Sequence, residues 1–425
     1  MTRTTARPAR ALGIDIGTSG VRAAAICEDG MPLEMEAVRF ERPDRMRDPA
    51  AWLAATAHAV RALAARVDLG GLRAIAVDGT SGSMVAVDAD LRPLASAMMY
   101  ADPVRERAVL DRIAEVAPAD SPALGPQSAL ARAMVLAHLP GAMRVLHQAD
   151  FVLAHLAGTI LPSDETNALK TGYDPILRGW GDWIEAAGFD MRLLPQVRPA
   201  GVPLGPCGAW GQALGLPKTA RLHAGVTDGC AAFLATGAGR AGDGVTSLGS
   251  TLVLKLVSDR PVFDAASGVY SHRIGDIWLA GGASNSGGAV LANLFGREAL
   301  ADLDARIDPD RPTGLDYYPL LCPGERFPVS DPTLAPRLMP RPESLVLFYQ
   351  AVLEGIAAIE AMGYRKLSEL GAPPLARLRS VGGGAAPGGF TALRKRVLDV
   401  DFAAPISTEA AVGVARLALR EGQFD

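Results

Sequence analysis

The chain has 425 residues, of which 49% are apolar and 21% are charged, and its formal net charge is −4. This length exceeds what one hydrophobic core usually serves, so we expect two domains. The weakly negative charge and the lack of a long basic run argue against a nucleic-acid surface, and no apolar run of about 20 residues suggests a membrane span. The four cysteines are far apart in the sequence, which predicts reduced thiols in a cytoplasmic protein and no zinc site.

The first part of the chain predicts the order strand, strand, strand, helix, strand. Residues 11–29 hold two apolar stretches around a Gly-Thr-Ser-Gly turn, and residues 33–40 alternate as a third strand does. An Ala-rich helix is expected over residues 48–67, because its opening Asp-Pro pair suits an N-cap and a first helical position. An apolar strand over residues 72–77 then ends in Asp-Gly-Thr-Ser-Gly, residues 78–82.

The second part of the chain repeats this order. Residues 244–257 read as two strands around a Gly-Ser-Thr turn, and further strands and a helix are expected within residues 269–295. A connector rich in Pro and Gly precedes them, so we divide the chain into an N-terminal lobe, residues 1–223, and a C-terminal lobe, residues 224–425. The remaining expected elements are a long loop over residues 308–345, a helix over 344–370, a strand over 378–381, a glycine loop over 382–389 and a last helix over 408–420.

The two Gly/hydroxyl turns match each other in spacing. Asp15-x-Gly17-Thr18-Ser19 corresponds to Ser247-x-Gly249-Ser250-Thr251, which indicates a duplicated core whose copies start 232 residues apart (247 minus 15). Backbone amides and small hydroxyls in such turns form anion-binding concavities, so we expect the pair to bind a polyphosphate. For either turn alone, an ordinary hairpin is the alternative. The expected phosphate-binding residues are Gly17, Thr18, Ser19, Gly249, Ser250 and Thr251.

Two aspartates are candidates for the chemistry. Asp15 lies in an otherwise apolar strand, where a carboxylate is costly unless it is paired or binds a cation such as Mg²⁺. Asp228 lies at a turn before a helix, where it is placed to accept the proton of an attacking hydroxyl. The alternatives are a local amide cap for Asp15 and a helix N-cap for Asp228.

A third motif, three successive glycines after the strand at residues 378–381, permits close approach of a planar group such as a nucleobase. Gly383, Gly384 and Ala385 are therefore expected to bind the nucleotide, and a flexible connection is the alternative. Residues 237–242 match G-x-G-x-x-G, but they follow a helix and precede a strand, the reverse of a dinucleotide-binding turn. The sequence contains no P-loop motif.

In the order and spacing of these motifs, the chain resembles the FGGY carbohydrate kinases. The resemblance implies an α/β, actin-like ATPase (ribonuclease H-like) fold, with two duplicated lobes around a central cleft. It also implies ATP and Mg²⁺ between the lobes, Asp228 as general base and Asp15 on the metal side. The matching segments are residues 13–19, 225–229, 247–251, 382–385 and 409–413.

The substrate is expected to be a pentulose. Xylulose kinases usually carry His-Gly-Gln where this chain has Asp-Gly-Thr-Ser-Gly, which resembles compact kinases assigned to D-ribulose. D-ribulose is therefore favoured, with D-xylulose or another polyol as the alternative, and Asp15, Ser81, Asp102 and Asp228 are expected to contact the sugar. For Asp102, the N-cap of a helix over residues 104–113 is the alternative. The rival class is an actin-like ATPase or sensor that phosphorylates no sugar, and the protein is expected to be a monomer or homodimer.

Overall fold

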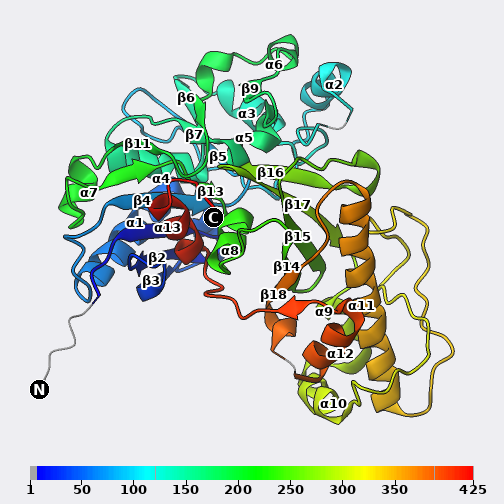
Figure 1. The fold of residues 1–425 in the computed structure, drawn as a ribbon. Coiled ribbons are helices and arrows are strands. Elements are labelled where there is room, and N and C mark those ends of the chain that lie inside the picture. Colours follow the sequence, from blue (N-terminus) through cyan, green and yellow to red (C-terminus); the bar gives the residue numbers. More distant parts are fainter. Residues whose placement is uncertain (1–6, 120, 387, 425) are drawn as a thin grey trace, which may run out of the picture. The chain divides into compact units, whose positions relative to one another are not determined.

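The computed structural model describes residues 7–119, 121–386 and 388–424, and the chain forms two compact units (Figure 1). The first unit contains the chain up to Gly237, a short return at residues 272–276, and the chain from Glu409 onward. The second unit contains residues 238–271 and 277–408. Both units are discontinuous, whereas the predicted lobes 1–223 and 224–425 are single stretches, and that functional division stays a prediction.

The first unit is built on a seven-stranded sheet with the order β11-β12-β4-β1-β2-β3, in which β13 also pairs with β4. β1 runs antiparallel to β2 and parallel to β4, and β4 runs parallel to β12 and β13. Every residue of β1 and β4 is buried, as expected for central strands covered on both faces. The strands are β1 (Ala11–Ile16), β2 (Gly20–Ile26), β3 (Pro32–Arg39), β4 (Ala74–Gly79), β11 (Pro203–Pro206), β12 (Arg221–His223) and β13 (Val226–Thr227).

Helices and short strand pairs complete this unit. The predicted cap of α1 is confirmed, because the Asp48 side chain accepts a hydrogen bond from Ala50 N and Pro49 opens the helix. The helices are α1 (Pro49–Ala64), α2 (Arg107–Val116), α3 (Ala129–Ala137), α4 (Gln148–Ala157), α5 (Glu165–Ala168), α6 (Trp183–Ala186), α7 (Ala209–Ala213), α8 (Asp228–Ala235) and α13 (Ala410–Leu419), with 3-10 turns at Pro43–Arg47, Leu169–Thr171 and Met191–Leu193. The pairs are β5 (Met84–Val87) with β6 (Arg144–His147), β7 (Ser163–Asp164) with β10 (Val197–Arg198), and β8 (Tyr173–Asp174) with β9 (Gly179–Trp180).

Helix α13 packs between β1 and α8 at two glycines (Figure 1). A Cβ atom on Gly13 would lie 1.9 Å from the carbonyl oxygen of Ala411, and one on Gly413 would lie 1.8 Å from that of Ala231. Only glycine permits backbones to approach this closely. The last helix of the chain therefore supports the strand that carries Asp15.

The second unit repeats the topology of the first. Its sheet has the order β16-β17-β15-β14-β18-β19, and β14 runs antiparallel to β15 and parallel to β18, as β1 does with β2 and β4. This repeated arrangement agrees with the expected duplication. The elements are β14 (Asp243–Leu248), β15 (Leu252–Ser258), β16 (Tyr270–Ile274, whose residues from 272 on belong to the first unit), β17 (Ile277–Ser284), β18 (Arg377–Val381), β19 (Asp401–Phe402), α9 (Gly288–Phe295), α10 (Leu300–Arg306), α11 (Leu345–Glu369) and α12 (Gly388–Leu398), with 3-10 turns at Ala265–Ser267, Arg297–Ala299 and Gly383–Ala385.

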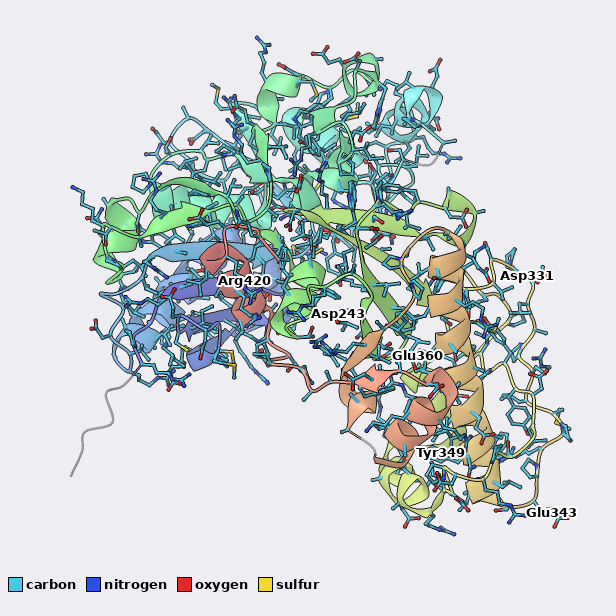
Figure 2. All side chains as sticks on the ribbon, in the orientation of Figure 1. Asp243, Asp331, Glu343, Tyr349, Glu360 and Arg420 are labelled. Atoms are coloured by element: carbon cyan, nitrogen blue, oxygen red, sulfur yellow. The ribbon has the colours of Figure 1, made fainter. Side chains whose placement is uncertain are left out.

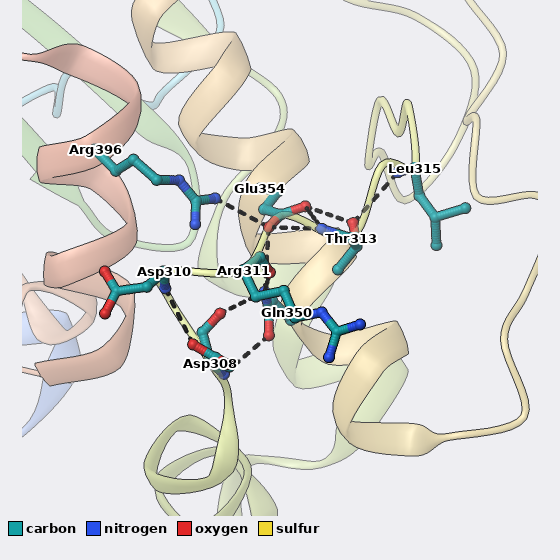
Figure 3. A network of polar contacts seen from close by, with 8 residues as sticks. All are labelled: Asp308, Asp310, Arg311, Thr313, Leu315, Gln350, Glu354 and Arg396. Carbon is teal, nitrogen blue, oxygen red and sulfur yellow. Dashed lines mark hydrogen bonds and ion pairs between the residues drawn. The ribbon is translucent and has the colours of Figure 1, made fainter.

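The long helix α11 is the core helix of this unit. Among the described residues it alone is long and apolar enough to cross a membrane by length and composition, but 61% of its apolar window is buried within the protein. Its polar side chains hold the irregular segment before it: Gln350 Nε2 donates to the carbonyls of Asp308 and Arg311, and Glu354 accepts from Thr313 N (Figure 3). The predicted long loop is thus anchored by hydrogen bonds at its start.

Candidate active site

Three aspartates meet at one edge of the first sheet. Asp15 is the last residue but one of β1 and lies opposite Asp78 of β4 in the parallel register, while Asp78 lies opposite Val226 of β13, two residues before Asp228. The carboxyl ends of parallel strands meet at the same edge, which is where open α/β sheets bind ligands. The structure therefore groups Asp15 and Asp228, as the sequence predicted, and adds Asp78.

Asp15 is buried and bound to an arginine. The residue is 5% exposed, and its Oδ2 accepts a hydrogen bond of 3.0 Å from Arg22 Nη1. Arg22 Nε also lies 3.5 Å from Glu409 at the start of α13. Burial raises the pKa of Asp15, although the charge and the hydrogen bond of Arg22 act in the opposite direction. Arg22 thus favours the ionised form that a cation would require.

Asp78 is the residue that sequence reasoning missed. It is 0% exposed, and neither carboxylate oxygen accepts a hydrogen bond from a described donor. Burial raises the pKa of Asp78 well above its ordinary value, and the neighbouring carboxylates of Asp15 and Asp228 raise it further. The sequence did contain a signal for Asp78: it is an acid at the end of an apolar strand, which is the same feature that identified Asp15. Asp15 and Asp78 together place negative charge in a buried site, and a proton or a cation must compensate that charge.

Asp228 is the accessible member of the group. It is the first residue of α8, whereas Thr227 occupies the N-cap position, so the alternative that Asp228 is the N-cap is wrong. Its side chain is half-buried, and Oδ1 lies 2.6 Å from Gly229 N. A carboxylate at the N-terminus of a helix is stabilised in its ionised form by the helix dipole. Asp228 is thus both reachable from solvent and in a favourable position to act as a base.

The first Gly/hydroxyl turn follows Asp15 directly. Gly17 N donates to Gly20 O at 3.0 Å, which closes the turn, and Thr18 and Ser19 are exposed. Small exposed hydroxyls in a glycine turn are suited to a phosphate group. The turn belongs to the first unit and shares its sheet edge with Asp15.

In the second unit, the other predicted turn adjoins the glycine loop. Gly249 O accepts a hydrogen bond of 2.9 Å from Gly288 N, and Ser250 is exposed. Cβ atoms on Gly382 and Gly384 would lie 2.8 Å and 2.9 Å from atoms of Leu248, the residue before the turn. The phosphate turn and the nucleotide loop are therefore neighbours, as one nucleotide site requires. The predicted residues of this unit are Gly249, Ser250, Thr251, Gly383, Gly384 and Ala385.

Asp102 is already bound within the first unit. Its carboxylate forms a two-pronged ion pair with Arg47, in which Nη2 donates to Oδ1 at 2.6 Å, and it accepts from Met99 N at 2.8 Å. The Arg47 hydrogen bond holds the pKa of Asp102 below its ordinary value. The N-cap alternative is wrong, because α2 begins at Arg107 with Glu106 before it. Any sugar contact of Asp102 would have to share a carboxylate that Arg47 already occupies.

A buried arginine joins the two segments that were predicted to contact the sugar. Arg132 is 1% exposed and donates to the carbonyl oxygens of Gly82, at 2.8 Å, and of Tyr100 and Asp102, at 3.2 Å and 3.1 Å. In the same turn, the Ser81 hydroxyl is buried and has no hydrogen-bond partner among the described residues. Arg132 thus fixes the turn at residues 78–82 beside the segment at 100–102, and nothing in its Ala-rich helix predicts this.

Comparison with known proteins finds a family match in the second half of the chain. Residues 244–421 match the model of the FGGY family of carbohydrate kinases, C-terminal domain. This match covers the C-terminal part of the chain. A relative from Escherichia coli (strain K12), "Xylulose kinase", is 26% identical over 407 residues, covering 88% of this chain and 82% of the relative.

Solved structures confirm the actin-like α/β fold. A "xyloylose kinase" from Brucella ovis has a TM-score of 0.84 at 24% identity, covering 97% of this chain and 90% of that one. A xylulose kinase from Rhodospirillum rubrum has a TM-score of 0.82 at 22% identity, covering 98% and 90%. The predictions of an FGGY carbohydrate kinase, a phosphotransferase that uses ATP and binds a small sugar, are thereby confirmed.

Proposed function

We propose that this FGGY kinase transfers the γ-phosphate of ATP to a primary hydroxyl of a pentulose, with D-ribulose favoured and D-xylulose as the alternative. The observation that carries the proposal is the half-buried Asp228 at the sheet edge where Asp15 and Asp78 also lie. Phosphoryl transfer depends mainly on positioning and on charge stabilisation, and this edge combines an accessible carboxylate with a buried pair of acids.

Asp228 is the general base in this proposal. The sugar hydroxyl donates its proton to the Asp228 carboxylate as the oxygen attacks the γ-phosphate. Because Asp228 opens α8, its backbone is fixed by the helix, while its side chain stays partly exposed to a substrate. The residue therefore orients the attacking oxygen as well as accepting the proton.

Mg²⁺ fits the residues beside this base. The orphaned, fully buried carboxylate of Asp78 and the Arg22-bound carboxylate of Asp15 are hard oxygen ligands of the kind that Mg²⁺ prefers. No group of three or more acid, histidine or cysteine side chains among the described residues could hold a metal by itself, so waters and phosphate oxygens would complete the shell. When bound, Mg²⁺ would neutralise charge that develops on the phosphates.

The nucleotide contacts are assigned to the two turns and the glycine loop. Backbone amides and hydroxyls of these turns would bind the phosphate oxygens, and the glycine loop would lie against the base. In the second unit, the contact of Gly382 and Gly384 with Leu248 supports this assignment. The assigned residues are Gly17, Thr18, Ser19, Gly249, Ser250, Thr251, Gly383, Gly384 and Ala385.

The sugar contacts are assigned to Asp15, Ser81, Asp102 and Asp228. The name of the E. coli relative supports a pentulose, and the Asp-Gly-Thr-Ser-Gly turn favours D-ribulose. The unpartnered Ser81 hydroxyl supports a polar ligand at this turn. We further propose that the kinase is cytoplasmic and acts as a monomer or homodimer.

Coupled ADP release over a panel of ketopentoses, aldopentoses, pentitols and glycerol tests the proposal. We expect turnover to require a sugar and kcat/KM to be highest for D-ribulose. A maximum for D-xylulose would transfer the assignment to the alternative substrate. ATP hydrolysis that no sugar stimulates would overturn the proposed function and support an actin-like ATPase or sensor instead.

A further inference from the structure

The strand that leads into Asp228 is short and constrained on both sides. β13 has two residues, and its Val226 and Thr227 lie opposite Asp78 and Gly79 of β4. A Cβ atom on the preceding Gly225 would lie 1.9 Å from Val77 O, so the chain touches β4 before the strand begins. An edge strand presents backbone groups that need partners, and here the partner is a side chain. Thr227 N donates to Thr166 Oγ1 at 2.9 Å.

The Thr166 hydroxyl is itself held in one direction. It donates to Asp164 Oδ1 at 2.6 Å, and Asp164 also accepts from the backbone amides of Thr166 and Asn167 and from Asn167 Nδ2. Thr166, Asp164 and Thr227 are 0%, 1% and 2% exposed. Because the hydroxyl proton is committed to Asp164, a lone pair of Oγ1 is directed at Thr227 N. Water has no access with which to replace this bond.

We infer that Thr166 is a positioning residue for phosphoryl transfer, acting through Thr227 on Asp228. This inference rests on the proposed role of Asp228 as general base. The chain Asp164–Thr166–Thr227 ends one residue before the base, so it sets the backbone from which the Asp228 side chain projects. A small displacement of a catalytic group lowers the rate without a matching loss of substrate binding, because the alignment of the reacting atoms deteriorates first.

The test compares Thr166→Val, which keeps the shape and removes the hydroxyl, with Thr166→Ser, which keeps the hydroxyl. In the full-length protein we expect Thr166→Val to lower kcat by about 10- to 100-fold. The KM values for ATP and for the pentulose should stay within about twofold, because the contacts that bind both ligands are untouched. Thr166→Ser should restore kcat, and hydrogen–deuterium exchange at the Thr227 amide should be faster in the Val variant alone.

Thr171→Val is the matched control. The Thr171 hydroxyl is as buried as that of Thr166 and lies 3.0 Å from His147 Nε2, so its loss also breaks a buried hydrogen bond in the first unit. We expect a lower melting temperature and an unchanged kcat. If both Val variants lower kcat equally, or if Ser does not rescue Thr166, the role of Thr166 is only structural and the inference falls.

Two further outcomes keep the inference separate from the proposed function. Wild-type kcat in Thr166→Val would overturn the inference while leaving sugar-dependent turnover of the wild type intact. A wild type without sugar-dependent turnover would instead overturn the proposed function. If Thr166→Val does not fold, Thr166→Cys replaces it: the thiol is a weak acceptor, so an intermediate kcat is expected, and wild-type kcat contradicts the inference.

Discussion

The two sheets share a topology but differ in charge at the same place. In the first unit, Asp15 of β1 lies opposite Asp78 of β4, whereas in the second unit Ser247 of β14 lies opposite Val381 of β18. One edge therefore presents two acids and the other none.

Buried charge is also compensated differently beneath the two sheets. In the second unit, Glu360 lies on α11 (Figure 2). Glu360 and Arg394 of α12 are both 0% exposed and form two hydrogen bonds, of 2.7 Å and 2.6 Å. Thr246 of β14 and Ser380 of β18 complete this network. In the first unit, Asp78 has no donor among the described residues. Complete compensation indicates a scaffold, whereas its absence indicates a site that a ligand completes.

The largest effect is expected from Asp228→Ala, which removes the proposed base from the charged edge. We expect kcat to fall by about 10²- to 10⁴-fold, the range typical for loss of a general base. ATP affinity, measured by calorimetric titration, should be unchanged, because the assigned nucleotide contacts lie elsewhere. Asp111→Ala, at an exposed acid on α2, is the control and should retain wild-type kcat. A near-wild-type kcat in Asp228→Ala would remove this residue from the mechanism.

Next in size is the effect of breaking the compensated pair in the second unit. Arg394→Met leaves the Glu360 carboxylate buried without its partner, which typically costs about 3–5 kcal/mol. Thermal unfolding and limited proteolysis of residues 277–408 should both show the loss. The double variant Glu360→Leu/Arg394→Met should recover much of it, since no lone charge remains. If Arg394→Met is as stable as wild type, the Glu360–Arg394 pair does not stabilise the second unit, and the contrast drawn with Asp78 is wrong.

The residues that decide these effects were not equally visible in the sequence. Asp15 was found because a carboxylate interrupts an apolar strand, and the individual strands and the α1 cap follow from local patterns. Arg132 and Thr166 act on partners 50 and 61 residues away, and no local pattern encodes such contacts. The same limit explains Asp102, which was predicted to contact the sugar, with a helix cap as the alternative, and which instead pairs with Arg47, 55 residues earlier. Local sequence patterns predict individual helices and strands, whereas the packing of distant segments decides which polar side chains contact each other.

A smaller effect is expected on metal affinity, which should depend on the acidic edge of the first sheet and not on the corresponding edge of the second. Asp78→Asn should lower the affinity of the metal-free protein for Mn²⁺ by about 10-fold, the lower end of the loss typical when a supporting metal-site residue is changed. Electron paramagnetic resonance of free Mn²⁺ measures this without requiring turnover. Val381→Asn, at the corresponding position of the second unit, is the matched control and should leave Mn²⁺ affinity unchanged. Equal affinities in wild type and Asp78→Asn would mean that a proton, not a cation, compensates the acid pair.

The smallest effect concerns two buried glutamates, one in each unit. Glu360 accepts hydrogen bonds from Arg394 and Thr246, whereas neither carboxylate oxygen of Glu165 has a hydrogen-bond donor within the part of the chain that the structure describes, and Arg178 Nε lies 3.4 Å from Oε2. Burial raises the pKa of Glu165 to about 7, although Arg178 and Arg273 act in the opposite direction. Glu165 is therefore a buried glutamate like Glu360, but it lacks the hydrogen bonds that compensate the charge of Glu360.

The sign of the pH effect follows from this raised pKa. Between the unfolded pKa of Glu165, near 4.5, and the folded value of about 7, the folded protein binds more protons than the unfolded chain, so the contribution of Glu165 to stability falls as pH rises. Glu165→Gln removes the titration. It should raise the melting temperature at pH 8 relative to wild type, corresponding to on the order of 2 kcal/mol, and change it little at pH 4.5. Melting curves of both proteins between pH 4.5 and pH 8 give the difference in melting temperature at each pH. The other acids are the same in both proteins, so this difference reports the titration of Glu165. A constant difference between the two proteins at every pH would show that Arg178 compensates Glu165 as fully as Arg394 compensates Glu360.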